Sequence, residues 1–254
     1  MLVILSPAKK LDVDGNKPTQ FTLPVFLNES ERLMNHLKKM SPKKIGKLMS
    51  ISDQLSELNH ERYANWSTDH SLNDSKQAMF SFTGEVYSGL AAISFSKEAL
   101  QEAQQRLRIL SGLYGVLKPL DLMHAYRLEM GTSLKVGVKK NLYEFWGDKI
   151  ANELNTALKD IDSEVLVNLA SNEYFKAVNK KKLKATIITP VFKDFSNGTY
   201  KTVMVYAKKA RGQMAAYILK NKITTPEEVI GFDADGYCYN EKASTPTEIV
   251  FYRG

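Results

Sequence analysis

Residues 165–176 read Val-Leu-Val-Asn-Leu-Ala-Ser-Asn-Glu-Tyr-Phe-Lys. The first five residues form a short apolar run, which is typical of a buried β-strand. Small polar residues follow at once, and ligands of α/β sheets collect at the carboxyl ends of strands. This stretch therefore predicts a buried strand that leads directly into a binding site.

Further strands of the same sheet are expected on either side of this segment in the sequence. The runs with strand-like composition are 2–5, 108–110, 185–192, 199–206 and 248–252. Ser196-Asn197-Gly198 separates two of them, and Asn-Gly between strand-like runs is a strong signal of a β-hairpin. A loop with irregular structure is expected at 12–24, which contains Gly15, Pro18 and Pro24 among polar residues.

Helices are expected wherever apolar residues recur at helical spacing. The predicted segments are 28–40, a helix starting at Pro42, 53–66, 96–107, 141–158 and 208–219. Asn28 and Asp53 are the expected N-caps, and proline is preorganised for the first position of a helix. The stripe Leu142, Phe145, Trp146, Ile150, Leu154 and Leu158 makes 141–158 the clearest prediction.

Strands and helices are mixed without strict alternation, and the sequence contains no flexible linker or internal repeat. The expected fold is therefore of the mixed α/β (α+β) class. We expect one compact domain over residues 1–254, with a mixed central sheet surrounded by helices. The helical N-terminal quarter, 28–66, should pack on this domain rather than form a separate one.

Composition restricts the possible functions. The only cysteine, Cys238, excludes an intrachain disulfide and a zinc site made of cysteines. No stretch approaches the roughly 20 apolar residues of a transmembrane helix, so a cytoplasmic protein without a membrane partner is expected. The net charge of +7 suggests a polyanionic partner, although solvated surface lysines are the commoner explanation of any single basic run.

The polar residues that follow the predicted strands are the first candidates for a site. Behind the strand at 165–169, these are Asn168, Ser171, Glu173 and Lys176. The structural alternative there is a helix-capping box, with Ser171 or Asn172 as the cap and acidic help from Glu173. Behind the N-terminal strand, the candidates are Ser6, Lys9 and Asp12, and a simple strand-ending turn explains them equally well.

The segment 106–131 is the densest in candidate residues. Ser111, Gly112 and Tyr114 follow a predicted strand, where backbone amides can converge on an anion. Lys118, Tyr126 and Arg127 supply donors of the kind that bind phosphate. A tight turn with paired charges is the alternative, because no phosphate-loop signature is present.

A third basic cluster comprises Lys208, Lys209 and Arg211. If the helix begins near Lys208, its exposed amides would add to these charges and favour a bound phosphate. The alternative is a solvated helix end. Tyr114, Tyr126 and Tyr174 lie within the polar motifs, and tyrosine rings can stack on unpaired bases, although each one is also a normal residue at the edge of a core.

No metal or cofactor is expected from the sequence. The four histidines are scattered and lack the spacing of common metal sites. His124, close to Tyr126 and Arg127, is the histidine of most interest.

Taken together, these motifs resemble the peroxide-stress protein YaaA family. The segments that carry the resemblance are 6–9, 82–90, 110–123, 126–131, 145–148, 168–176 and 207–212, so that it extends over almost the whole chain. The resemblance implies a cytosolic protein that limits peroxide damage and lowers free iron. It also implies DNA binding through a positively charged cleft and a helix-hairpin-helix element. The best match to that element is 39–48, which keeps only one of its glycines, Gly46, and ordinary helix packing is the alternative.

Three functions follow, of which the first is preferred. In the first, a monomer binds double-stranded or locally opened DNA through the basic residues and tyrosines named above, and its binding weakens as salt rises. In the second, an enzyme acts on a nucleobase, a nucleotide or damaged DNA, with Lys9, Lys176 or Lys209 as a nucleophile. Its carboxylates would be Asp12, Asp121, Glu129 and Glu173. In the third, the protein sequesters iron directly, which the lack of clustered ligands disfavours.

Overall fold

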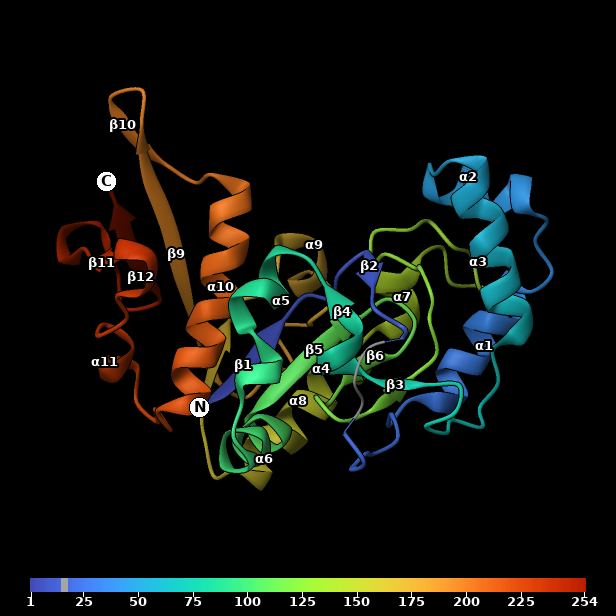
Figure 1. Ribbon diagram of the computed structural model, residues 1–254, viewed down its shortest axis with the longest axis horizontal. Coiled ribbons are helices and arrows are strands. Elements are labelled where there is room, and N and C mark those ends of the chain that lie inside the picture. The colour runs from blue at the N-terminus through green and yellow to red at the C-terminus, as the bar shows by residue number, and fades with distance from the viewer. Residues whose placement is uncertain (15–17) are drawn as a thin grey trace.

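A computed structural model describes residues 1–14 and 18–254, and its centre is an eight-stranded sheet (Figure 1). The strands lie in the order β11-β12-β9-β8-β1-β5-β6, and β10 pairs with β9. Neighbouring strands from β12 to β5 are parallel, whereas β11, β6 and β10 are antiparallel to their partners. The sheet is thus mixed, and the expected mixed α/β fold class is confirmed.

The middle of the sheet is fully buried. β1 (Leu2–Leu5) lies between β5 (Leu107–Ser111) and β8 (Val165–Asn168), with Val3 opposite Leu107 on one side and Val167 on the other. Short apolar strands of this kind are the ones that parallel sheets bury on both faces. The predicted strands at 2–5 and 165–169 are therefore confirmed, and the one at 108–110 is two residues longer than expected.

The position of β1 determines where a ligand can bind. From β1 the chain continues to β5 on one side of it, and only later reaches β8 on the other side. Ligands of open α/β sheets bind outside the carboxyl ends of the strands at such a reversal of strand order. The loops after β1 and β8 are therefore the natural walls of a site.

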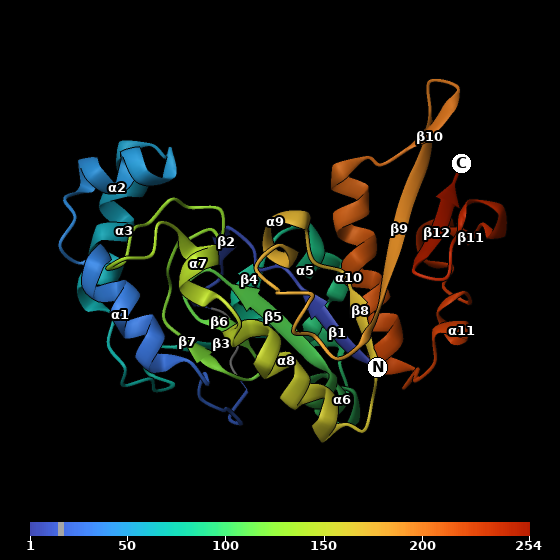
Figure 2. The ribbon, with the colours of Figure 1, turned by 180° about the vertical axis from the view of Figure 1, so that it is seen from behind.

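Helices cover both faces of the sheet (Figures 1 and 2). One face carries α10 (Met204–Lys220), which crosses α5 (Glu85–Leu90) at close range. The other face carries α8 (Lys149–Asp160). α6 (Lys97–Arg106) packs beside α10 and is capped by Ser96, whose hydroxyl accepts a hydrogen bond from the Ala99 amide, so the helix predicted at 96–107 is confirmed.

The N-terminal helices lie at the opposite end of the molecule from the C-terminal strands (Figure 1). They are α1 (Leu27–Leu37), α2 (Pro42–Met49) and α3 (Asp53–Asn65). Their buried residues belong to the same cluster as those of the central strands: Leu33, Met34, Leu37, Ile45 and Tyr63. Pro42 stands at the first helical position as predicted.

Two predicted N-caps are wrong by one or two residues. α1 begins at Leu27, so that Asn28 lies inside the helix, and Phe26 is at the cap position. α3 is capped by Ser52, whose hydroxyl accepts from the Leu55 amide, and Asp53 is the first helical residue. In α3, serine and aspartate are adjacent good caps, and the sequence alone does not rank them.

The long helix predicted at 141–158 is two helices. α7 (Leu142–Trp146) ends at Gly147, and α8 begins after Asp148. Gly147 has a φ of 49°, a conformation that glycine adopts without the steric cost of a Cβ atom. The apolar stripe continues across the break, which explains why periodicity alone predicts one helix.

The hairpin predicted around Asn197-Gly198 is confirmed. β9 (Thr186–Ser196) and β10 (Thr199–Lys201) are antiparallel, and both turn residues have positive φ, as the favoured two-residue turn requires. The second strand is shorter than expected. It ends at Lys201, and Tyr206 lies in α10 rather than in a strand.

The remaining strands are β2 (Lys10–Leu11), β3 (Lys76–Gln77), β4 (Phe82–Thr83), β6 (Gly115–Leu117), β7 (Leu122–Met123), β11 (Cys238–Tyr239) and β12 (Glu248–Arg253). The remaining helices are α4 (Ala78–Ser81), α9 (Asn172–Phe175) and α11 (Pro226–Val229), with single 3₁₀ turns at Ala92–Ser94, Ala234–Gly236 and Glu241–Ala243. β2 pairs with β4 and β3 with β7 in two small sheets. Of the helices in the described part of the chain, none is both long and apolar enough to span a membrane.

Candidate functional site

A cavity of about 780 Å³ lies at the carboxyl ends of β1 and β8. We call it the strand-end cavity. Five parts of the chain line it: the loop after β1, the turn between β4 and α5, the segment around Tyr126, the start of α9 and one side of α10. The lining residues are Ser6–Lys10, Thr83–Val86, Tyr126–Glu129, Leu169, Ser171–Tyr174, Thr202, Met204, Lys208 and Arg211.

Two serines tie the strand ends together at the cavity. The Ser6 hydroxyl accepts a hydrogen bond from the Ser171 amide at 2.8 Å and donates to the Ser171 hydroxyl at 3.2 Å. The Tyr87 hydroxyl donates to the Ser6 carbonyl at 3.0 Å. Ser171 occupies the N-cap of α9 but its side chain makes no capping bond, so the hydroxyl serves the joint between the strands instead.

A carboxylate holds two of the cavity's cations. Glu129 accepts from the Lys9 ammonium at 2.7 Å through one oxygen and from the Arg127 guanidinium at 3.0 Å through the other. Arg127 is largely covered, with 16% of its side chain exposed, whereas Lys9 is 63% exposed. The three groups together carry a net charge of +1 and join the loop after β1 to the segment 126–131.

α10 presents cations to two different sides. Lys208 and Arg211 are three residues apart on one side of the helix, and both line the strand-end cavity. Lys209 lies on another side and pairs with Asp235 at 2.8 Å. The helix begins at Met204, so the basic cluster is one turn inside it, and the predicted contribution of exposed helix amides near Lys208 is wrong.

Arg211 is the cavity's unusual cation. It is partly buried, and burial lowers the pKa of its guanidinium. No hydrogen bond or ion pair joins the Arg211 side chain to any other residue within 1–14 and 18–254, whereas Arg127 has Glu129. A covered and unpaired cation is costly to keep, which makes an external anion its natural partner.

Two tyrosines form part of the cavity wall. Tyr126 and Tyr174 are 5% and 7% exposed, and burial raises the pKa of both hydroxyls. The Tyr126 hydroxyl is 2.6 Å from the Ser111 hydroxyl. With so little of either side chain exposed, these rings shape the wall rather than offer a wide stacking surface.

The turn after β5 packs against the segment 126–129, which forms part of the cavity wall. Ser111 is completely buried, and its hydroxyl accepts from the Tyr114 amide. A Cβ atom at Gly112 would come within 2.2 Å of the Leu128 carbonyl oxygen. Glycine therefore allows the segment that carries Arg127 to lie directly against this turn, but neither Ser111 nor Gly112 lines the cavity.

Tyr114 lies in the core, 0% exposed, with no free ring face for a nucleobase. Its hydroxyl accepts from the Trp66 indole at 2.9 Å and from the His124 amide at 3.1 Å, and it lies 3.1 Å from the His70 ring. The stacking role expected for Tyr114 therefore does not fit this structure. Through these bonds Tyr114 joins residues 66–70 to the segment that contains His124.

Several other predicted site residues also lie outside the cavity. Asn168 is buried and accepts from the Ala170 amide. Asp12 pairs with Lys76 at 3.0 Å. Asp121 is buried between Thr22 and the Lys118 amide, and burial raises the pKa of its carboxyl group. Lys118 and Asp121 line a separate, smaller cavity.

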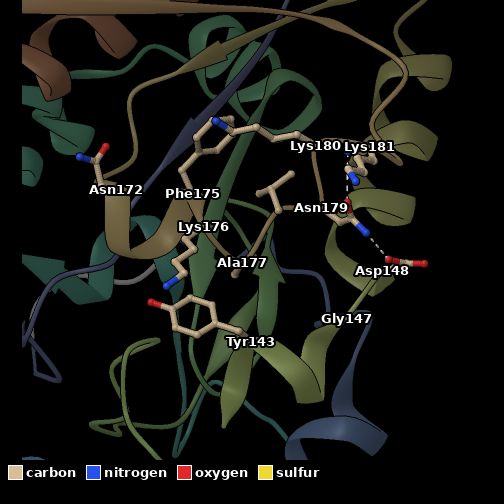
Figure 3. Close-up of a pocket in the computed structure, with 11 residues that line it drawn as sticks. Tyr143, Gly147, Asp148, Asn172, Phe175, Lys176, Ala177, Asn179, Lys180 and Lys181 are labelled. Atoms are coloured by element: carbon tan, nitrogen blue, oxygen red, sulfur yellow. Dashed lines mark hydrogen bonds between the residues drawn. The ribbon is translucent and has the colours of Figure 1, made fainter.

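Lys176 belongs to a second hollow of about 600 Å³ on the other side of α9 (Figure 3). Its ammonium lies over the Tyr143 ring, 5.1 Å from the centroid, and Lys180 lies over Phe175 at 4.9 Å. Lys181 completes this lysine hollow, and the Asn179 amide donates to Asp148 at its edge. Asn172 lines both cavities, so the hollow is the neighbour of the strand-end cavity across α9.

Sequence reasoning missed part of the wall. The missed residues are Pro7, Ala8, Lys10, Thr83–Val86, Leu128, Leu169, Asn172, Thr202 and Met204. Lys10 directly follows a predicted candidate, and Glu85 falls within a segment that carries the family resemblance, so both had a signal in the sequence. Glu173, which was predicted, accepts from the Gly131 amide at 2.8 Å and joins α9 to the segment 126–131.

Metal ligands are not gathered in the described part of the chain. No group of three or more His, Cys, Asp or Glu residues there is arranged to hold a metal ion. His70 and His124 are close neighbours, with ring centroids 4.3 Å apart, but they are buried beside Tyr114 away from the strand-end cavity.

Comparison with known proteins shows that the segments around the cavity belong to a known family. The family described as peroxide stress protein YaaA matches residues 1–243. The chain belongs to this family. The match to the YaaA family includes the loop after β1, the segment 126–131, the start of α9 and the cavity side of α10, so the cavity lies wholly within the shared sequence.

Relatives of the YaaA family align with the whole chain. A UPF0246 protein of Shewanella amazonensis is 54% identical over 254 residues, which is all of this chain and 99% of the relative. UPF0246 proteins of Aliivibrio fischeri and Colwellia psychrerythraea are each 52% identical, again over the whole chain and over 98% and 99% of their own lengths. The resemblance expected from the sequence motifs is therefore confirmed.

Proposed function

We propose that this protein binds DNA in the cytoplasm through the face that carries the strand-end cavity. In this proposal it acts as a monomer during peroxide stress and helps to limit free iron and oxidative damage to DNA. Membership of the peroxide stress family supports the physiological setting. The net charge of +7 supports a polyanionic partner.

The observation that carries the proposal is the set of cavity cations without carboxylate partners. Within the described ranges of the chain, Lys10, Lys208 and Arg211 form no ion pair. Lysine and arginine that are not neutralised internally are available to phosphates, and replacing condensed counterions on DNA favours the complex. In the lysine hollow, Lys176, Lys180 and Lys181 are likewise free of ion pairs among the residues described.

The helix pair α2 and α3 supplies a second contact in this proposal. Lys43, Lys44 and Lys47 are exposed on α2. A Cβ atom at Gly46 would come within 2.6 Å of the Ser56 hydroxyl oxygen of α3, so this glycine allows the two helices to approach closely. We propose that the pair acts as the helix-hairpin-helix element and binds the DNA backbone through these lysines.

A salt titration tests the DNA proposal. The affinity for a 20-base-pair duplex, measured by fluorescence anisotropy, should fall linearly on a logarithmic scale as NaCl is raised. Lys208→Gln should weaken binding and reduce the magnitude of the slope by about 1, because one phosphate contact is lost.

The matched control is Lys209→Gln, one position along the same helix. Lys209 already pairs with Asp235, so its loss should leave the slope nearly unchanged. Equal slopes for the two variants, or an affinity of the unmodified protein that does not respond to salt, would contradict binding through the strand-end cavity.

A second candidate function rests on the carboxylates in the same cavity. Glu85, Glu129 and Glu173 line it together with Lys9, and phosphate binding alone has no use for carboxylates. Acid–base chemistry on a nucleobase, a nucleotide or damaged DNA does use them. A turnover screen against duplexes that contain damaged bases, with borohydride trapping of a lysine adduct, tests this candidate. Absence of both product and adduct would rule out a lysine-dependent glycosylase.

A further inference from the structure

Arg211 and Lys208 are neighbouring cations in the wall of the strand-end cavity. Both lie on the cavity side of α10, and neither has an acidic partner in the part of the chain that the structure describes. The other covered cation of the cavity, Arg127, is satisfied by Glu129. Since Arg211 is partly buried without a partner, the fold keeps this charge at the expense of stability.

The size of the cavity limits what these two cations can hold. Its volume of about 780 Å³ lies within the range of small-molecule sites, which runs from about 300 to 1,000 Å³. The wall also has an apolar part, made by Pro7, Val86, Leu128 and Leu169. An anion with an apolar portion of small-molecule size therefore fits the site better than an inorganic anion alone.

Polar side chains that can hydrogen-bond to such a ligand lie at the exposed edge of the strand-end cavity. The Asn172 side-chain amide has no hydrogen-bond partner among the described residues, and it points away from Lys180 and Lys181 (Figure 3). An amide offers both a donor and an acceptor, which is the combination that matches the edge of a nucleobase. The exposed Glu85 carboxylate adds a further acceptor at the turn between β4 and α5.

We propose that the strand-end cavity binds a single nucleotide unit. Arg211 and Lys208 hold its phosphate, the apolar wall packs against its base, and Asn172 reads the edge of the base. This inference rests on the proposed function and names the ligand of the same cavity. The nucleotide has two possible sources, a free nucleoside monophosphate or a residue extruded from a DNA strand, and both present the same phosphate and base.

Calorimetry with deoxynucleosides and their 5′-monophosphates tests this site. dAMP should bind at least about tenfold more tightly than deoxyadenosine, because a charge-assisted contact to phosphate is gained. Arg211→Gln should reduce the affinity for dAMP to that for deoxyadenosine, and Arg211→Lys should restore part of the difference. Lys209→Gln, whose side chain pairs with Asp235 outside the cavity, should bind dAMP as the unmodified protein does.

Thermal unfolding separates loss of binding from loss of folding. Because Arg211 is an unpaired and partly buried charge, Arg211→Gln should unfold at the same temperature or higher without ligand. A folded Arg211→Gln variant that still prefers dAMP over deoxyadenosine overturns the inference. So does equal affinity of the unmodified protein for the two compounds, or binding of neither.

Duplex binding distinguishes failure of this inference from failure of the proposed function. If the duplex binds but dAMP does not, the nucleotide site is wrong and DNA binding stands; if neither binds, both are wrong. A duplex with 2-aminopurine opposite an abasic site identifies the source. A fluorescence increase that dAMP competes away indicates an extruded nucleotide, dAMP binding without an increase indicates a free one, and an increase that dAMP does not affect contradicts the site.

Discussion

Replacing Gly212 by alanine is expected to lower the free energy of unfolding by about 3 kcal/mol. A Cβ atom at Gly212 would lie 1.8 Å from the Val86 carbonyl oxygen and 2.7 Å from the Leu90 amide nitrogen. Across the same crossing, a Cβ atom at Gly89 would lie 2.1 Å from the Lys209 carbonyl oxygen. α5 and α10 thus meet backbone against backbone, and a methyl group fits only if the helices separate.

Whether Gly212→Ala raises or lowers the free energy of unfolding shows whether helix propensity or the contact between α5 and α10 has the larger effect. In an isolated helix, glycine to alanine is stabilising by about 1 kcal/mol, so helix propensity alone predicts a more stable protein. Urea unfolding at neutral pH measures the outcome. Separation of the helices would also displace Val86 and Arg211, and the variant should therefore lose affinity for dAMP together with stability.

Gly46→Ala is the matched control, because it makes the same substitution within α2. The nearest atom there is the Ser56 hydroxyl oxygen, and a side chain can give way where a backbone carbonyl cannot. The control should change stability by about 1 kcal/mol or less. A Gly212→Ala variant that is as stable as the unmodified protein would show that the two helices are not in close contact.

The parts of this fold that the sequence predicts are those that depend on neighbouring residues. β1 and β8 are apolar runs that the sheet buries. Ser96 caps α6 through the amide three residues later, and Asn197-Gly198 supplies the positive φ angles of a two-residue turn. Each of these signals is complete within a few positions, so each was available without knowledge of the rest of the chain.

The parts that the sequence does not predict depend on contacts between distant segments. The close crossing at Gly212 is invisible in the sequence, because its partner Val86 lies far away in the chain. The break at Gly147 is a different case: glycine is a local signal of a helix end, but the apolar stripe continues across it into α8. The early start of α10 at Met204 likewise overrides the strand-like composition of the residues before Lys208.

The candidate site likewise has a part that the sequence predicts and a part that depends on distant contacts. The sequence names the polar residues after β1 and after β8 as separate candidates, and in the structure Ser6 and Ser171 meet. The sequence does not indicate which of the cavity's cations remain without an acidic partner. Glu129 takes up Lys9 from a distant loop, whereas Arg211 receives no such partner among the residues described. The sequence therefore identifies several cations of the cavity but not which of them lack an acidic partner.

The buried cluster around Tyr114 leads to a prediction about acid. The Tyr114 hydroxyl accepts from Trp66 and from the His124 amide, so its own proton is directed to Nε2 of His70. Nδ1 of His70 donates to the Thr68 carbonyl at 3.1 Å. This pattern requires a neutral imidazole, because a proton on Nε2 would leave the Tyr114 hydroxyl with a third donor facing it.

Acid should therefore weaken the fold through His70. Burial, together with the nearby charge of His124, lowers the pKa of His70 from 6.5 to about 4, while Asp69 and Asp74 act in the opposite direction. The unfolded chain takes up the proton near pH 6.5 and the folded chain only near pH 4, so stability is full above pH 6.5 and falls as the pH is lowered to about 4. The loss should be about 2 to 3 kcal/mol from this residue.

Urea unfolding at a series of pH values, on the unmodified protein and on His70→Gln, isolates this contribution. Glutamine keeps an acceptor for the Tyr114 hydroxyl and does not titrate, so the difference between the two proteins should be largest above pH 6.5 and shrink toward pH 4. His36→Gln is the control, since His36 is exposed on α1 and faces only the Arg32 carbonyl. If His70→Gln and the unmodified protein lose stability in parallel as the pH falls, the fold does not lower the pKa of His70 and does not depend on its neutral imidazole.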